Sequence, residues 1–521
     1  MSSPAAAPAN IPSRPDAARA IHGSHWLRDL PLTQRYEPLR SRIETDVLVI
    51  GGGITGLSAA LELRQRGRRV AVCEAGLIGA GTTGGSTGHL DFYPEPGAAK
   101  LIDRVGEEVA GDYVAARRGA IDTIEKRAAA GCGFARVPAY YYTEQGANLD
   151  AVREEFEAAR RLGMPVEWMD NVPIPRAVGG FRIDGCARID ILAYQRHLAT
   201  LVDDAGGTLF ERTLVESPSD GEPSELSTRS DGGSAADGSV GFDGLVLATH
   251  SNFTTNLRLY AETPAYQSYA MGIRIAGELP DALFWDDSDP YYYVRRVGDD
   301  ASELIVGGCD HRTGLDDPSA RLAELERWAR ERFDVTEVAS RWSAELFEPT
   351  DGLPLIGRVP GFENVVTGIG FSGTGLTLGT MAGRLLAAAL SAAEADQTLE
   401  SPLMAACDPG RFSVAALAGA AVEQAKSAVG YARYAAPHGE IDPDALQPGE
   451  GRVGSIGGIR VAVCRDTDGC LHRSSPTCPH MGGELAWNPV EQTWDCPVHG
   501  GRFSADGKRL YGAPETDLEP A

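Results

Sequence analysis

The stretch DVLVIGGGITGLSAALEL, residues 46–63, decides the fold of this 521-residue chain. A short apolar run leads into three glycines, Gly51-x-Gly53-x-x-Gly56, and an Ala/Leu-rich helix start follows. The next apolar run ends in Glu74. Such glycines allow a tight turn and a close approach of pyrophosphate to a helix N-terminus, and the acid can bind ribose hydroxyls. The spacing predicts a dinucleotide-binding βαβ unit, and it leaves FAD and NAD both open.

Three further stretches follow this unit. They are GAGTTGGSTG (Gly79–Gly88), GLVLATH (Gly244–His250) and GIGFSGTGLTLGTMAGRLLA (Gly368–Ala387). In this order and at these distances they resemble the D-amino-acid oxidase/glycine oxidase-like superfamily of flavoenzymes, although His250 replaces the usual glycine. The lead-in SHWLRDLP (Ser24–Pro31) resembles the gamma-glutamylputrescine oxidoreductase branch.

The resemblance implies FAD as the cofactor and an α/β fold, with a Rossmann-like FAD-binding domain and an antiparallel-sheet substrate domain. Strand-like runs at Tyr291–Val297 and Glu303–Gly308 fit that sheet. In some relatives a histidine binds the flavin covalently, and Gly85 stands at that position here, so we expect noncovalent FAD. The FAD-contacting residues expected from the motifs and the resemblance are Gly51, Gly53, Gly56, Glu74, Thr82, Thr83, Gly84, Ser86, Val215, Ala248, Gly370, Gly373 and Gly375.

A second set of motifs lies near the C-terminus, in CPHMGG (478–483) and CPVHGGRF (496–503). Each loop offers one thiol and one imidazole, from Cys478, His480, Cys496 and His499. The alternative is a Cys2His2 zinc site, in which the two cysteines usually form one pair and the two histidines the other. The mixed loops resemble the Rieske domain, which implies a small all-β domain holding a [2Fe–2S] cluster, with the cysteines on one iron and the histidines on the other.

Breaks in composition divide the chain into four parts. We predict an N-terminal tail and lead-in at residues 1–45, an FAD-dependent oxidoreductase unit at 46–395, a linker at 396–445 and the Rieske domain at 446–521. A helix is expected in the linker near Val414–Val429.

Two segments of the oxidoreductase unit have a local pattern of their own. Residues 91–200 look mainly helical, because apolar positions recur three and four apart. The polar stretch Pro218–Ser239 predicts a loop.

The predicted function follows from the two cofactors and from the lack of a second dinucleotide-binding βαβ unit for NAD(P)H. The superfamily oxidises C–N bonds of amines and amino acids, so we expect such a substrate to reduce the flavin. Electrons would then pass to the cluster and on to a soluble, ferredoxin-like carrier. In the alternative reading the cluster feeds electrons into the flavin for a reductive or monooxygenase reaction. A redox-sensing module is a further alternative.

Candidate catalytic residues are His89 and Arg295. His89 follows the flavin-contacting turn as a proton acceptor, and a histidine packed at a strand edge is the alternative. Arg295 lies in the predicted roof sheet, where the superfamily often binds a substrate carboxylate; an ordinary ion pair is the alternative. The tyrosines of Tyr140–Tyr142 and Tyr291–Tyr293 are candidates for an amine pocket or for the core.

Charge and hydropathy exclude other classes of function. The net charge of −25, from 48 basic and 73 acidic residues, argues against nucleic acid as a partner. No apolar run reaches the length of a membrane span, and the first 25 residues look like a disordered tail. We therefore expect a cytoplasmic protein.

Overall fold

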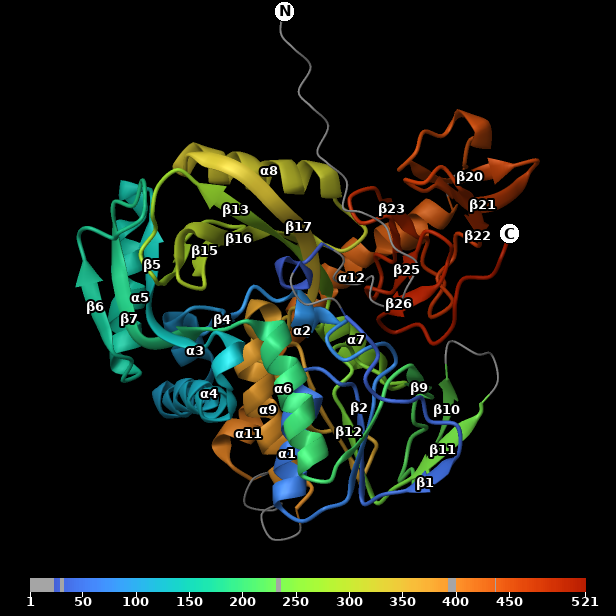
Figure 1. The fold of residues 1–521 in the computed structure, drawn as a ribbon, viewed down its shortest axis with the longest axis horizontal. Coiled ribbons are helices and arrows are strands. Elements are labelled where there is room, and N and C mark those ends of the chain that lie inside the picture. Colours follow the sequence, from blue (N-terminus) through green and yellow to red (C-terminus); the bar gives the residue numbers. More distant parts are fainter. Residues whose placement is uncertain (1–22, 29–31, 231–235, 392–399, 436) are drawn as a thin grey trace, which may run out of the picture.

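The computed structural model describes residues 23–28, 32–230, 236–391, 400–435 and 437–521. Most of the predicted N-terminal tail lies outside these residues. The described chain forms a large α/β part and a smaller C-terminal all-β part, with a long helix between them (Figure 1). The predicted fold class is confirmed.

A six-stranded sheet forms the base of the large part. Its order is β18 (Leu355–Arg358), β19 (Val365–Ile369), β12 (Gly244–Leu247), β2 (Val47–Ile50), β3 (Val70–Cys73) and β8 (Thr208–Phe210). All neighbours are parallel except the edge pair β18–β19. Both faces of the central strands are buried, which is why their sequences are continuously apolar rather than alternating.

The two faces of this sheet bury different neighbours. Val47 and Val49 join the apolar cluster of helices α1 (Ile54–Gln65), α6 (Ile191–Asp204) and α9 (Gly375–Ala389). The intervening residues of β2 face a small four-stranded sheet instead. That sheet consists of β1 (Arg42–Glu44), β11 (Gly238–Gly241), β10 (Glu225–Ser230) and β9 (Thr213–Val215).

The prediction of a loop over Pro218–Ser239 was therefore wrong for residues 225–230, which form β10, and for residues 238–239, which begin β11. Leu226, Thr228 and Ser230 alternate inward along this strand. Two of these three inward residues are polar, so the alternation carried too little apolar signal to be recognised. Residues 231–235 lie outside the described residues.

A nine-stranded sheet roofs the large part (Figure 1). Its order is β17 (Val335–Phe347), β13 (Ala265–Ile275), β16 (Asp300–Arg312), β15 (Tyr292–Val297), β14 (Leu283–Asp286), β5 (Ala135–Thr143), β7 (Gly179–Arg188) and β4 (His89–Leu90), with β6 (Val166–Met169) paired to β7. Strands β15 and β16 confirm the two strand-like runs. Residues 91–200 are mainly helical, as predicted, but they also contain β5, β6 and β7, which the prediction missed.

Helices surround the two sheets and lead to the C-terminal part. They are α2 (Thr82–Gly85), α3 (Ala98–Val105), α4 (Glu107–Arg127), α5 (Leu149–Arg161), α7 (Leu257–Glu262), α8 (Pro318–Arg332), α11 (Pro402–Cys407) and α12 (Val414–Ala435). Helix α12 confirms the predicted linker helix. Of the described helices, none combines the length and apolar character that a bilayer crossing would need.

The C-terminal part contains two small antiparallel sheets. One is formed by β20 (Gly451–Ile456), β21 (Ile459–Arg465) and β22 (Leu471–Ser474). The other is formed by β23 (Ala486–Asn488), β24 (Thr493–Asp495), β25 (Arg502–Ser504) and β26 (Arg509–Tyr511). The CPHMGG loop connects β22 of the first sheet to β23 of the second, and the loop that begins CPVHGG connects β24 to β25.

The close contact of α1 with α9 gives the first testable prediction. A Cβ atom on Gly383 would lie 2.7 Å from the Ser58 Cβ and 2.8 Å from the Ala59 nitrogen. Gly383→Ala should therefore force the two helices apart and lower the free energy of unfolding by about 1–3 kcal/mol. Gly111→Ala, in α4 with nothing within 4 Å, should instead raise it by about 0.5–1 kcal/mol. Thermal melts of the two variants check this, and equal melting temperatures would contradict it.

Candidate functional site

A cavity of ≈ 640 Å³ lies between the two large sheets. On one side it is bounded by the carboxyl ends of β2, β3 and β12, where Gly51, Glu74 and Ala248 stand. On the other side it is bounded by residues of the nine-stranded sheet. Crevices at the carboxyl ends of parallel strands are the usual ligand sites of such sheets.

The first glycine turn brings backbone close to the cavity. Gly51 has φ +107°, and a Cβ atom there would lie 2.3 Å from the Ala248 carbonyl oxygen. The Glu74 carboxylate accepts hydrogen bonds of 2.8 Å from the backbone N–H groups of Gly52 and Gly76. Burial raises the pKa of Glu74. This is the arrangement that a nucleotide ribose and pyrophosphate need.

The hydroxyl-rich turn lies against the same helix start. Thr83 Oγ1 accepts a hydrogen bond of 3.2 Å from the backbone N–H of Ile54, in the first turn of α1. Thr82 Oγ1 donates to the Glu345 carbonyl at 3.2 Å, and the His250 Nε2 lies 3.0 Å from that same oxygen. His250 adopts the left-handed conformation, φ +68°, in the place where the superfamily usually has glycine.

Most of the predicted FAD-contacting residues line the cavity. They are Gly51, Gly53, Glu74, Thr82, Thr83, Ser86, Val215, Ala248, Gly373 and Gly375. Gly56, Gly84 and Gly370 are not among the lining residues. A Cβ atom on Gly56 would lie 1.9 Å from the Gly51 carbonyl oxygen, so this glycine lets helix α1 pack on the turn. The contacts of all thirteen with FAD stay predictions.

The roof side of the cavity is acidic and aromatic. Asp91, Glu95, Glu155 and Asp286 line it, together with Tyr93 and Trp285. Within the two tyrosine triplets the side chains alternate: Tyr141, Tyr291 and Tyr293 line the cavity, whereas Tyr140, Tyr142 and Tyr292 join a separate apolar cluster. Each triplet therefore contributes to the cavity wall and to the core, with alternate residues on the two sides of the strand.

His89 lines the cavity at the start of the roof sheet. Its Nδ1 lies 3.0 Å from Thr87 Oγ1, and its ring meets Tyr293 edge-on at 5.2 Å. Its Nε2 is buried without a hydrogen-bond partner. Burial, reinforced by Arg295, holds the pKa of His89 well below its ordinary value. His89 is therefore a neutral imidazole in the cavity wall whose Nε2 is buried, and its role as proton acceptor stays a prediction.

Arg295 occupies a different position from the one predicted for a substrate-binding arginine. It is buried, and it is not among the residues that line the cavity. It donates hydrogen bonds to the carbonyl oxygens of Thr87 (2.7 Å) and Ile189 (3.2 Å), and burial lowers its pKa to about 9. The geometry therefore assigns Arg295 to bracing the turn before His89, and a carboxylate-binding role gains no support.

The two cysteine–histidine loops have matching backbone geometry. In the first, the Cys478 N–H donates to the Gly483 carbonyl (2.9 Å) and the Gly482 N–H donates back to the Cys478 carbonyl (3.0 Å). In the second, the Cys496 N–H donates to the Gly501 carbonyl (2.8 Å) and the Gly500 N–H donates back to the Cys496 carbonyl (3.1 Å). Gly482 and Gly500 both have positive φ, +75° and +70°, which closes each turn.

The four predicted ligands meet as two pairs. The thiols of Cys478 and Cys496 lie within hydrogen-bonding reach of each other, and the rings of His480 and His499 are 5.1 Å apart. The Nδ1 of His499 is buried without a partner. Among the described residues, no group of three or more Cys, His, Asp or Glu is placed to hold a single metal ion. A thiol pair beside an imidazole pair fits the donor set of an asymmetric [2Fe–2S] cluster.

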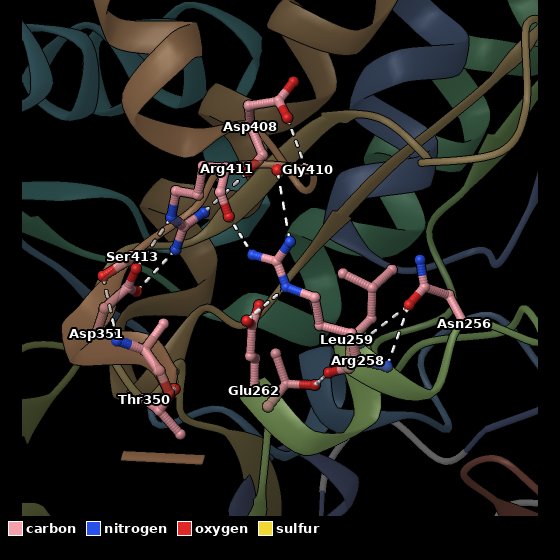
Figure 2. Close-up of polar contacts among 12 residues, drawn as sticks. Asn256, Arg258, Leu259, Glu262, Thr350, Asp351, Asp408, Gly410, Arg411 and Ser413 are labelled. Carbon is pink, nitrogen blue, oxygen red and sulfur yellow. Dashed lines mark hydrogen bonds and ion pairs between the residues drawn. The ribbon is translucent and has the colours of Figure 1, made fainter. Parts of the chain in front are cut away.

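The histidine pair contacts the large part through Tyr260 of α7. The Tyr260 ring lies 4.9 Å from the His480 ring and 4.8 Å from the His499 ring. Figure 2 shows how α7 is fixed: Asn256 caps its start and Arg258 pairs with Glu262 at 2.7 Å.

The same region of Figure 2 contains the chain that leads to α12. Arg258 also donates to the Arg411 carbonyl, and the Arg411 guanidinium binds the Asp351 carboxylate at 2.7 and 3.0 Å. Helix α12 then packs against the second cluster loop, since a Cβ atom on Gly430 would lie 2.8 Å from the Pro497 ring. These contacts dock the C-terminal part on the large part.

The second cluster loop approaches the cavity wall. Gly512 lines the cavity, and a Cβ atom on it would lie 2.8 Å from the Gly500 carbonyl oxygen. A Cβ atom on Gly500 would in turn lie 2.5 Å from Glu345 Oε1. Glu345 also lines the cavity, so both neighbours of this loop are wall residues.

The sequence motifs did not identify several residues that line the cavity or contact the cysteine–histidine loops. Asp91 and Glu95 follow His89 in the run HLDFYPEP, and this polar run after the turn was an available signal. Tyr260 and the residues of β26 had no local signal, because their contacts are made with distant segments.

Comparisons with known families and curated proteins agree with both motif sets. Residues 46–389 match the family described as FAD dependent oxidoreductase, and residues 440–518 match the Rieske [2Fe-2S] domain. The putative Rieske 2Fe-2S iron-sulfur protein YhfW of Bacillus subtilis (strain 168) is 28% identical over 511 residues, 95% of this chain and 96% of that protein. The gamma-glutamylputrescine oxidoreductase of Escherichia coli (strain K12) is 47% identical over 55 residues, 11% of this chain and 13% of that protein.

Solved structures show the same fold at low sequence identity. Glycine oxidase from Geobacillus kaustophilus has a TM-score of 0.57 at 19% identity and covers 71% of this chain and 99% of its own. An L-amino acid deaminase from Proteus vulgaris has a TM-score of 0.57 at 16% identity and covers 76% of this chain and 100% of its own. The cofactors are thus FAD and a Rieske [2Fe–2S] cluster. The chain belongs to the FAD dependent oxidoreductase family and carries a Rieske domain at its C-terminus.

Proposed function

We propose that this oxidoreductase oxidises a C–N bond of an amine or amino acid and passes the electrons through its Rieske cluster to a soluble, ferredoxin-like carrier. The observation that carries the proposal is the position of Gly512, which lines the FAD cavity and packs against the second cluster loop. Electron tunnelling falls steeply with distance, so a cluster loop at the cavity wall supports direct exchange between the two cofactors.

The protein's own residues bind and orient the reactants. FAD supplies hydride acceptance when bound, and the cluster supplies one-electron transfer. Gly51, Glu74 and the first turn of α1 hold the nucleotide end of FAD. His89 lines the roof compartment as a neutral imidazole, and it is the residue that we propose to accept the proton of a substrate ammonium, which must be lost before C–N oxidation.

The charges of the roof compartment favour an amine over an amino acid. Asp91, Glu95, Glu155 and Asp286 line the cavity, and aromatic rings stand between them. Among the described residues, two cations line the cavity: Arg509 of the Rieske domain, next to Glu74 at the nucleotide end, and Lys100 of α3, so the carboxylates of the roof compartment outnumber its single lysine. Carboxylates beside aromatic rings attract a cationic amine, and they repel a substrate carboxylate.

We keep two further predictions as part of this proposal. They are the cytoplasmic location and the domain boundaries at residues 1–45, 46–395, 396–445 and 446–521.

Anaerobic mixing with a panel of amines, N-methyl amino acids and amino acids tests the electron route. Amines should bleach the flavin and produce the EPR signal of a reduced cluster. Cys478→Ser, which removes a predicted ligand, should keep FAD and its bleaching by substrate but lose the cluster signal. The control Cys470→Ser, at an exposed thiol outside the cluster loops, should behave as the wild type. Flavin that is reduced only by reduced ferredoxin would contradict the proposal and favour the opposite electron flow.

Glu95 provides a pH test of substrate choice. Burial, with Asp91 adding to it and Arg117 opposing it, raises the pKa of Glu95 to about 7. Below that pH the carboxyl is neutral and attracts a cation less, so KM for a cationic amine should rise as the pH falls through about 7. Glu95→Gln should raise KM on the order of tenfold at high pH, since about 1.4 kcal/mol of lost attraction is a factor of ten. The same substitution should also flatten the pH dependence of KM.

Glu154→Gln is the matched control, because Glu154 is exposed on α5 and does not line the cavity. It should leave KM and its pH profile unchanged. An unchanged profile in Glu95→Gln would show that the cavity charge does not select the substrate.

A further inference from the structure

We propose that the Rieske domain completes the FAD site, with Arg509 as a binding residue for the anionic diphosphate end of the cofactor. Strand β26 (Arg509–Tyr511) and Gly512 line the same cavity as Gly51 and Glu74 of the first glycine turn. One wall of the nucleotide site therefore comes from the C-terminal domain rather than from the FAD-binding fold itself.

The topology of the Rieske sheet makes this wall available. Strand β26 is the last strand of its sheet and pairs only with β25. Its residues are half-buried rather than buried, although they lie between the two parts of the protein. The remaining exposure of Arg509, Leu510 and Tyr511 is consistent with the cavity that all three line.

Arg509 is held rigidly in this wall. Its backbone N–H donates to Asp517 Oδ1 at 2.8 Å, its Nε donates to the Pro514 carbonyl, and its Nη2 donates to the Gly512 carbonyl at 3.1 Å. The guanidinium is thus fixed by two backbone carbonyls, and the carboxylates of Glu74, Glu515 and Asp517 lie close enough to favour its charged form. A guanidinium whose position is fixed in advance loses little entropy when it binds a phosphate group.

The charge of Arg509 acts at the nucleotide end of the cavity. Arg509 lowers the pKa of Glu74, which burial raises, so the two side chains are close enough to interact. Among the described residues, Lys100 and Arg509 are the cations that line the cavity. Lys100 belongs to α3, whose first turn binds Glu155 of the roof compartment. Arg509 is therefore the cation placed to balance a diphosphate at the N-terminus of α1.

The inference rests on the FAD site of the proposed function and on neither its substrate nor its electron route. The two can therefore fail separately: a weakened FAD site is measured without turnover, and the electron route is measured by cluster reduction.

The test is FAD affinity in full-length variants that retain the cluster. Apoflavoprotein is titrated with FAD by fluorescence, and the cluster is followed by its visible absorbance and by EPR after dithionite reduction. Arg509→Gln should raise the Kd for FAD by about tenfold or more, as expected for loss of a charge-assisted hydrogen bond. Its affinity for riboflavin, which has no phosphate, should change much less, and the cluster spectrum should stay unchanged.

Arg452→Gln is the matched control, since Arg452 is exposed on β20 of the same domain and does not line the cavity. It should bind FAD as the wild type does. A wild-type Kd for FAD in Arg509→Gln would overturn the proposal, and so would an equal loss of FAD and riboflavin affinity. If Arg509→Gln does not keep its cluster, Arg509→Lys is tested instead. A Kd for FAD that is severalfold higher than that of the wild type, with an intact cluster, supports the proposal. A wild-type Kd overturns it.

Discussion

The close packing between the second cluster loop and strand β17 is the contact on which the arrangement of the two cofactor sites depends. Glu345 of β17 faces both sites. Its carbonyl oxygen binds Thr82 in the hydroxyl-rich turn, and its carboxyl oxygen faces Gly500 in the cluster loop. Only a glycine fits at residue 500, because a Cβ atom there would overlap both Glu345 and Ala265. A shift of either domain would therefore disturb both sites at once.

Docking of the Rieske domain uses several independent contacts around this point. Tyr260 covers the histidine pair, α12 covers Pro497, and Arg312 binds Ser427 of α12 at 2.7 Å. These contacts are largely buried, whereas a tethered domain that swings between partners would need an exposed and polar interface. The structure fits a Rieske domain that is fixed beside the cavity.

Local sequence was sufficient to predict the parts of the two sites in which function requires particular residue types at fixed spacing. The glycine turn with Glu74 and the two cysteine–histidine loops were recognisable, because backbone approach and metal ligation restrict which residues can stand there. The fold class followed from them. Strands β5 to β7 and β10 were missed, since partly polar strands on half-buried surfaces carry little periodic signal.

The limits of sequence are clearest at Arg295. Arg295 is buried in β15, but its place in a predicted strand does not show which interior its side chain enters. The carbonyls of Thr87 and Ile189 that bind Arg295 come from distant segments, and so do the cavity contacts of Arg509. Such contacts become visible only when the segments are placed together in space.

The position of β26 in the cavity wall has a consequence for biosynthesis. Ribosomes release a chain from its N-terminus onward, so the glycine turn at Gly51 emerges long before Arg509. A nascent chain that has already folded its parallel sheet would still present an open nucleotide site. With Arg509 binding FAD as we propose, stable flavin loading would be a late event in maturation, and a chain that lacks its final strands would be released as a flavin-poor protein even though its dinucleotide motif is intact.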